Sequence, residues 1–249
     1  MQTKREYNYT GSFLGVIKWS VIRHKYLIPA FTVIQMILAV AIVYGLSQFL
    51  SYVDDISVLY LSSGAVALGI IAVGCVLAPQ IVSEARQNGI LKYQRTLPVS
   101  RISILLADII IWGLTALPGI VMSIIASMLR FQVSPHISLS GISALIISLV
   151  SLICIGFCIA YWLPPTTVSL VTQLIMFGGL LFSPIVFPES RLPEWSRYVY
   201  KALPFVSISK MIRTEIFQAI TMSAEDVITV VLWGILTFVL ALVALGRRQ

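Results

Sequence analysis

Hydrophobic and polar positions fall in long blocks along this chain, not at the two-residue period of a β-strand. Six continuous apolar runs are separated by short polar segments. Each run is long enough for a helix that crosses a hydrocarbon core about 30 Å thick at about 1.5 Å per residue. Barrel strands would instead alternate in polarity over about ten residues. The pattern predicts an all-α membrane protein with six transmembrane helices, over residues 27–50, 58–82, 102–128, 142–163, 168–187 and 227–245.

Composition strengthens this prediction. The 249 residues are 58% hydrophobic and 11% charged, whereas a soluble domain carries about 25% charged residues. A soluble fold could not cover its surface with so few charges, and a disordered chain would need low hydrophobicity. Cys75, Cys154 and Cys158 lie inside apolar runs without a His or carboxylate beside them, so we interpret them as packing residues and not as a zinc site.

The distribution of lysine and arginine predicts the orientation, since cytoplasmic loops carry the excess of these residues. With six spans, eleven lie on the side of both termini and six on the other. We therefore expect a multi-pass protein of the cell membrane with both termini in the cytoplasm. The net charge of +7 then reflects attraction to anionic lipid head groups and not binding of nucleic acid.

The segment over residues 10–26 has the pattern of a helix on a membrane surface. Its apolar stretch is interrupted by Lys18, Arg23 and Lys25, which excludes a secretory signal. Apolar residues recur at helical spacing opposite Lys18 and Lys25: Phe13, Leu14, Ile17, Val21 and Ile22. We predict an interfacial helix before the first span, with a plain juxtamembrane anchor as the alternative.

One ionisable residue, Asp108, lies well inside a predicted span. It follows Ile102 by six residues, about 9 Å at helical rise, so we place it towards the cytoplasmic end. Arg101 or Arg95 could pair with it there. A paired structural role is favoured over a gating or substrate role.

Catalytic and nucleotide-binding patterns are missing from the sequence. His24 and His136 flank spans without a ligand cluster, and neither a Ser/His/Asp triad nor a paired-carboxylate site is evident. The phosphate-binding pattern G-x-x-x-x-G-K-[ST] does not occur. We therefore expect no enzyme activity of its own, and any ATP-driven step would need a separate chain.

The segment between the second and third spans, residues 83–101, predicts a short helix across the cytoplasmic face. Glu84 and Arg86 follow the span, and Asn88-Gly89 is a turn signal. Residues 90–96 form a short amphipathic piece, Pro98 ends it, and Ser100 is a plausible N-cap of the next span. Such a helix could act as a lever on two spans, or it could be a plain basic connection.

A second informative segment covers residues 183–226. Pro184, Pro188, Pro193 and Pro204 divide it into short pieces, and Trp195 suits the membrane interface. We predict short helices embedded in the outer interface. They should lean on the spans, since irregular backbone at membrane depth must pack against protein or line water.

Together the two segments resemble ABC-2 type export permeases. In that family the loop between the second and third spans is a coupling helix that docks on the ATP-binding subunit, and outer re-entrant helices cap the substrate pathway. The resemblance places ATPase coupling at Glu84, Gly89, Leu91, Leu97, Pro98 and Ser100, with Arg86 added for its charge. It places the outer gate at Leu192, Pro193, Trp195 and Pro204, to which we add the prolines that divide the start of the segment, Pro184 and Pro188.

The resemblance implies that residues 1–249 form a single permease domain of an ATP-binding-cassette exporter. A dimer of permease chains would bind two ATPase subunits, which hold ATP and Mg, while this chain binds no cofactor. The pathway would run between protomers beside spans 2 and 5, whose glycines could equally serve packing inside one protomer: Gly64, Gly69, Gly74, Gly178 and Gly179.

The expected cargo is apolar or amphipathic, such as a drug or antibiotic, because the spans hold few stacking aromatic residues or charges. Export of a lipid, glycolipid or polysaccharide is the alternative within the same family. An intramembrane enzyme and an ion-coupled carrier are the alternatives from other classes.

Overall fold

A computed structural model describes residues 9–48, 54–90, 94, 96, 99–181, 183–188, 193, 200, 202–218 and 220–246. These residues form helices and connecting turns. The helices, with π-helices labelled η, are α1 (Tyr9–Arg23), α2 (Leu27–Val40), η1 (Ala41–Gly45), α3 (Leu46–Gln48), α4 (Asp55–Ile71), η2 (Ala72–Leu77), α5 (Ala78–Gln87), α7 (Arg101–Phe131), α8 (Leu139–Trp162), α9 (Pro165–Leu181), α11 (Pro204–Ile212), η4 (Arg213–Phe217) and α12 (Ala224–Gly246).

Within the described residues, five helical stretches are long and apolar enough to cross a membrane. The first two each run through a π-helix without a break, so α2 to α3 and α4 to α5 are continuous rods. The all-α membrane class is therefore confirmed. The stretches are Leu27–Gln48, Asp55–Gln87, Arg101–Phe131, Leu139–Trp162 and Ala224–Gly246.

The predicted span over residues 168–187 differs from the helix that forms there. Helix α9 covers Pro165–Leu181 and has 17 residues, about 26 Å at helical rise. Residues 183–188 leave the helix and make turns, where Pro184 and Pro188 remove backbone donors. The helix is thus shorter than a hydrocarbon core of about 30 Å, and a sixth crossing stays a prediction.

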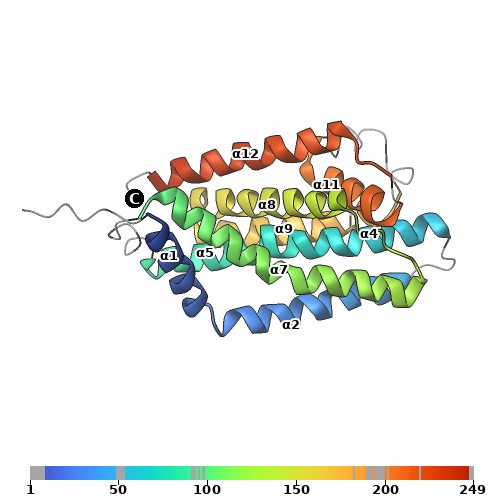
Figure 1. Ribbon diagram of the computed structural model, residues 1–249, viewed down its shortest axis with the longest axis horizontal. Helices are drawn as coiled ribbons and strands as arrows, with labels where there is room; N and C mark the ends of the chain where they lie inside the picture. The colour runs from blue at the N-terminus through green and yellow to red at the C-terminus, as the bar shows by residue number, and fades with distance from the viewer. Residues whose placement is uncertain are drawn as a thin grey trace, which may run out of the picture.

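The long helices lie roughly side by side, and α1 crosses them at a steep angle (Figure 1). Helix α1 and the C-terminal end of α12 occupy the same end of the bundle, which we call the terminal end. Helix α11 lies at the opposite end, which we call the far end. The α1 helix agrees closely with the segment predicted over residues 10–26, while its place on a membrane surface stays a prediction.

Helix α1 packs on α7 through one apolar face. Val16 is buried together with Ile104 and Ala107, and Phe13 and Ile17 pack against this cluster. A second apolar set, Leu14, Val21 and Ile22, is exposed. The apolar positions predicted to share one face therefore divide between a face on α7 and a face that no described residue covers.

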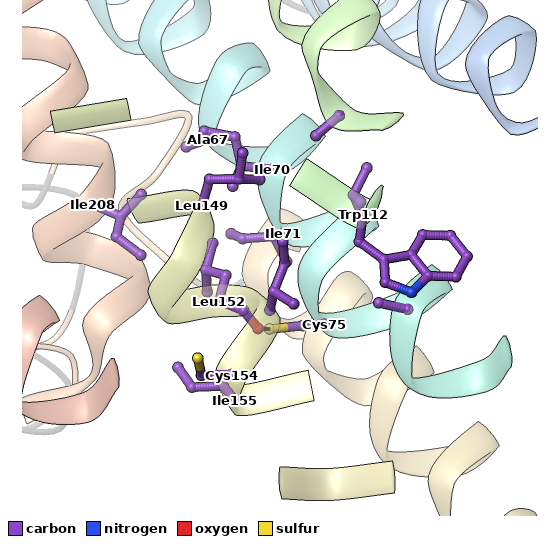
Figure 2. Packing of buried hydrophobic residues seen from close by; sticks show 14 of the residues in the cluster. Ala67, Ile70, Ile71, Cys75, Trp112, Leu149, Leu152, Cys154, Ile155 and Ile208 are labelled. Atoms are coloured by element: carbon purple, nitrogen blue, oxygen red, sulfur yellow. Dashed lines mark hydrogen bonds between the residues drawn. The ribbon is translucent and has the colours of Figure 1, made fainter. Parts of the chain in front are cut away.

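The rod from α4 to α5 forms the centre of the bundle. It contacts α7, α8, α9 and α11, and most residues between Leu61 and Cys75 are buried. Figure 2 shows Ile70 and Ile71 of this rod beside Leu149 and Leu152 of α8. The Cys75 thiol donates to the Leu152 carbonyl at 3.5 Å, which supports its interpretation as a packing residue.

A close helix approach joins η2 to α8 at two glycines. A Cβ on Gly74 would lie 2.8 Å from the Cβ of Leu152, and a Cβ on Gly156 would overlap the Gly74 carbonyl oxygen. Similarly, a Cβ on Gly64 would lie 2.9 Å from the Ile185 carbonyl oxygen. Gly64 and Gly74 therefore serve packing inside one chain, which was the alternative to a place beside the pathway.

Candidate functional site

The connection after α5 begins with the turn that the sequence predicts. Gly89 has a φ of 73°, a left-handed conformation that glycine adopts without steric cost. The Asn88 amide donates to the Glu84 carbonyl at 3.0 Å and the Gly89 amide to the Arg86 carbonyl at 3.3 Å. Helix α5 therefore ends in a tight turn at the terminal end of the bundle.

The predicted N-cap of the third span is also confirmed. The Ser100 hydroxyl accepts from the Ser103 amide at 3.0 Å, which satisfies one of the free donors of the first turn of α7. Leu91, Leu97 and Pro98, the other positions assigned to coupling, lie outside the described residues. The coupling helix between the turn and Ser100 stays a prediction.

Arg86 and Glu84 have different surroundings although they share α5. Nη1 of Arg86 donates to the carbonyls of Ala160, Tyr161 and Leu163, at 3.1, 3.2 and 3.0 Å. These carbonyls end α8, where helical carbonyls have no partner within the helix and a cation is favourable. Glu84 is exposed. Arg86 thus ties α5 to the end of α8, and Glu84 is open to another molecule.

Asp108 is buried at the junction of α7 with α1. The Ser20 hydroxyl donates to Asp108 Oδ1 at 3.0 Å, and Arg23 is the cation whose charge acts on this carboxylate. The expected pairing with Arg101 is therefore wrong, because α1 brings its own polar side chains to Asp108. Arg101 instead lies against Gly246 at the end of α12, and Arg95 is outside the described residues.

His24 extends this polar cluster at the corner between α1 and α2. Its Nδ1 lies 2.9 Å from the Ser20 carbonyl, its Nε2 accepts from Arg23 Nε at 3.2 Å, and its ring centroid is 5.6 Å from that of Trp112. Burial lowers the pKa of His24 to about 4, and the Arg23 charge adds to this shift. A neutral imidazole therefore joins the C-terminal end of α1 to Trp112 of α7.

At the far end, Arg213 connects three segments. Its Nε donates to Ser63 Oγ of α4 at 3.1 Å, and its Nη2 donates to the Ile185 carbonyl at 3.3 Å and to Ser209 Oγ at 3.0 Å. The guanidinium carbon also lies 3.5 Å from the centroid of the Tyr60 ring. Arg213 thus holds α11 and the turn over residues 183–188 against α4.

Glu215 fastens the same segment to α8. It accepts from the Ser140 hydroxyl at 2.6 Å, from the Ser138 hydroxyl at 3.4 Å and from the Met222 amide at 2.9 Å. The Ser140 hydrogen bond is the main reason that the pKa of Glu215 lies below its ordinary value. Arg213 and Glu215 were not singled out from the sequence, because their charges were counted with the outer loop.

The predicted outer gate is partly visible. Pro204 is buried at the start of α11, and Pro184 is buried in the turn that Ile185 anchors. Pro188 is half-buried and Pro193 is exposed. Leu192 and Trp195 lie outside the described residues. The structure therefore brings the Pro184 turn to α11. The gating role of these residues stays a prediction.

In the described part of the chain, no three His, Cys, Asp or Glu side chains lie close enough together to bind a metal ion. The geometry instead offers two mechanical junctions. At the terminal end α1 and α5 are fastened to α7 and α8, and at the far end α11 is fastened to α4 and α8. The fold and these junctions define an all-helical integral membrane protein with polar fasteners at both ends.

Comparison with known families identifies this class more closely. The family described as ABC-2 type transporter matches residues 17–217. Because the match covers most of the chain, the protein belongs to the ABC-2 type transporter family. Members of this family are membrane transport subunits, which in general work with an ATP-binding-cassette ATPase. A comparison with curated proteins gave no match.

Proposed function

We propose that this chain is the permease subunit of an ATP-binding-cassette exporter in the cell membrane, with both termini in the cytoplasm. The terminal end is then the cytoplasmic end and the far end is the outer one. Two copies of the permease would form the pathway between them, and this dimer would bind two ATPase subunits. Those subunits hold ATP and Mg, and this chain binds no cofactor.

The hydrogen bonds of Arg86 to the end of α8 are the observation that carries this proposal. The turn at Asn88 and Gly89 lies at the terminal end, where an ATPase could reach it. A force applied to this turn passes directly into α5, and Arg86 passes it on to α8. Arg86 then transmits the movement, while the exposed carboxylate of Glu84 contacts the ATPase.

The second fastener, at Asp108, supports the same mechanism. Ser20 ties α1 to α7 within the polar cluster that also holds Arg23 and His24. An ATPase that contacts α1 would therefore move α7 at the same time. Asp108 is in this account a structural residue that makes α1 and α7 move together, not a substrate ligand.

For the cargo we propose an apolar or amphipathic molecule, with a drug or antibiotic preferred. Helix α9 supports this choice, because it presents an apolar surface to such a cargo. Its exposed face carries Leu170, Leu174 and Phe177, each more than half exposed. Gly178 on the same helix has open space around it. The pathway therefore lies along α9, whereas the rod of α4 and α5 is largely enclosed by its own chain.

Co-purification with a candidate ATP-binding-cassette ATPase subunit tests the proposal. The complex should hydrolyse ATP and move a fluorescent amphipathic drug into inverted vesicles. Glu84→Arg should reduce co-purification several-fold, because it reverses the charge at the contact. Glu225→Arg is the matched control, since Glu225 is an exposed acid in the first turn of α12 at the far end.

Two results would contradict the proposal. If the chain binds no ATP-binding-cassette ATPase, the exporter assignment fails. If Glu84→Arg and Glu225→Arg both co-purify like the natural chain, the assigned contact at Glu84 fails while the exporter assignment stands. A complex that hydrolyses ATP but moves a lipid or glycan, and not the drug, would overturn the cargo alone.

A further inference from the structure

A cavity of about 490 Å³ opens between α7, α8 and α12. Its walls include Leu106 of α7, Val150 of α8 and Ile235 of α12, all of them exposed. The Ser151 hydroxyl in the lining already donates to the Val230 carbonyl at 2.8 Å. The cavity therefore offers an occupant an apolar surface, since the Ser151 hydroxyl hydrogen is already used.

Arg101 bridges α7 and α12 at the terminal end of this cavity. Its Nη1 lies 2.8 Å from the position that a Cβ on Gly246 would occupy, so the first residue of α7 touches the last residue of α12. The side chain is exposed, and no hydrogen bond or ion pair joins it to any described residue. As Asp108 is satisfied by Ser20, the Arg101 charge is available to an external anion.

The depth of these groups matches a phospholipid. Leu106 follows Arg101 by five residues, about 7.5 Å along the helix, and Phe238 precedes Gly246 by eight, about 12 Å. The charge therefore lies at the surface, and the apolar cavity between the same two helices begins one to two turns deeper. The Trp162 indole, which donates to the Leu240 carbonyl at 3.0 Å, is a residue type enriched at the membrane interface.

We propose that this cavity binds one acyl chain of an anionic phospholipid whose phosphate pairs with Arg101. The lipid belongs to the leaflet at the terminal end, and it holds α12 beside α7, which otherwise make few direct contacts. The charge of Arg101 favours an anionic lipid over a zwitterionic one. An apolar helix of a second chain would fit the cavity but would leave this charge unused. The site is distinct from the pathway proposed along α9.

Photo-crosslinking in lipid nanodiscs tests the proposal. The full chain is placed in nanodiscs that contain phosphatidylglycerol or phosphatidylcholine with a photoreactive group on the acyl chain, and the labelled peptides are mapped. We expect phosphatidylglycerol to label the peptides around Leu106, Val150 and Ile235. We expect its labelling to exceed that by phosphatidylcholine about fivefold, the factor for one basic residue near an anionic surface.

Two pairs of variants separate the acyl-chain contact from the charge. Ile235→Trp fills the cavity and should abolish the labelling, whereas Leu236→Trp should retain it, because Leu236 is equally exposed on α12 but does not line the cavity. Arg101→Gln should remove the preference for phosphatidylglycerol, and Arg101→Lys should retain most of it. If Arg101 served only to close the end of α12, Arg101→Gln would leave the lipid preference unchanged.

Several results would overturn the proposal. Equal labelling by both lipids, or equal effects of Ile235→Trp and Leu236→Trp, would show that the cavity only samples bulk lipid. A disulfide between two Ile235→Cys chains, formed in place of lipid labelling, would show that a second copy occupies the cavity. None of these results depends on ATPase binding or transport, so they leave the exporter proposal unaffected.

Discussion

The crossing of η2 and α8 predicts that Gly156→Ala destabilises the protein. A methyl group at position 156 would overlap the Gly74 carbonyl oxygen and lie 3.0 Å from Cδ of Pro79. Neither neighbour can rotate away, because one is backbone and the other a proline ring. The two helices must therefore separate, and the contacts of the buried core around Cys75 and Leu152 separate with them.

The expected magnitude follows from two opposing effects. Overpacking a core costs about 1–3 kcal/mol. Because both neighbours of position 156 are rigid, we take the upper end of this range, about 3 kcal/mol. Alanine gains about 1 kcal/mol over glycine in helix propensity. The net loss is about 2 kcal/mol, or about 4–8 °C in melting temperature for a chain of this size.

Thermal unfolding followed by tryptophan fluorescence in detergent measures this loss. Gly113→Ala is the matched control, because its Cβ would make an ordinary contact of 3.6 Å with Leu149 Cδ2. The control should be neutral or more stable by up to about 1 kcal/mol. A melting temperature of Gly156→Ala equal to that of Gly113→Ala would refute the close approach of η2 and α8.

Three further predictions concern the polar fasteners. The pKa of His24 falls from 6.5 to about 4 on folding, so the neutral ring contributes stability above pH 6.5 that is lost as the pH falls towards 4. His24→Gln should therefore lose less melting temperature between pH 7.5 and 5 than the natural chain, and equal losses would contradict this. Arg213→Met should cost about 1–3 kcal/mol, because it removes the hydrogen bonds that Arg213 donates to Ser63, Ser209 and the Ile185 carbonyl. Unchanged protease resistance of the α11 segment would argue against such a fastener. Asp108→Asn keeps an acceptor for the Ser20 hydroxyl but removes the negative charge that acts on Arg23, so it should cost less than Asp108→Leu, which removes both and should cost about 1–3 kcal/mol. Identical melting of the two variants would exclude a role for this hydrogen bond.

Local signals in the sequence predicted local structure well. The turn at Asn88 and Gly89 and the cap at Ser100 are confirmed, because each depends on a residue and its near neighbours in the chain. The apolar runs likewise predicted where the long helices lie, since the pattern needs only the membrane as a solvent. The end of α9 at Leu181 was missed, because the apolar run continues past the residue where the helix stops.

Partners between distant segments required the tertiary structure. Asp108 was expected to pair with Arg101 or Arg95, both near it in the chain, but α1 supplies Ser20 from 88 residues away. Arg86 was expected to face a partner molecule, but it binds the end of α8. Arg213 was counted with the outer loop, but it is buried against α4. In each case the sequence showed that the side chain was polar. It did not show which helix would lie beside that side chain.

The sequence by itself determined that this chain is a helical membrane protein, because 58% hydrophobic residues in long runs leave no other way to satisfy the backbone in a bilayer. It also contained the two segments that resemble the ABC-2 type transporter family. Only the tertiary structure decided which helices touch, and therefore where each scarce charge finds its partner. The physical reason is that apolar helices in lipid carry little sequence information about their neighbours, whereas a buried charge must be satisfied by whichever neighbour packing supplies.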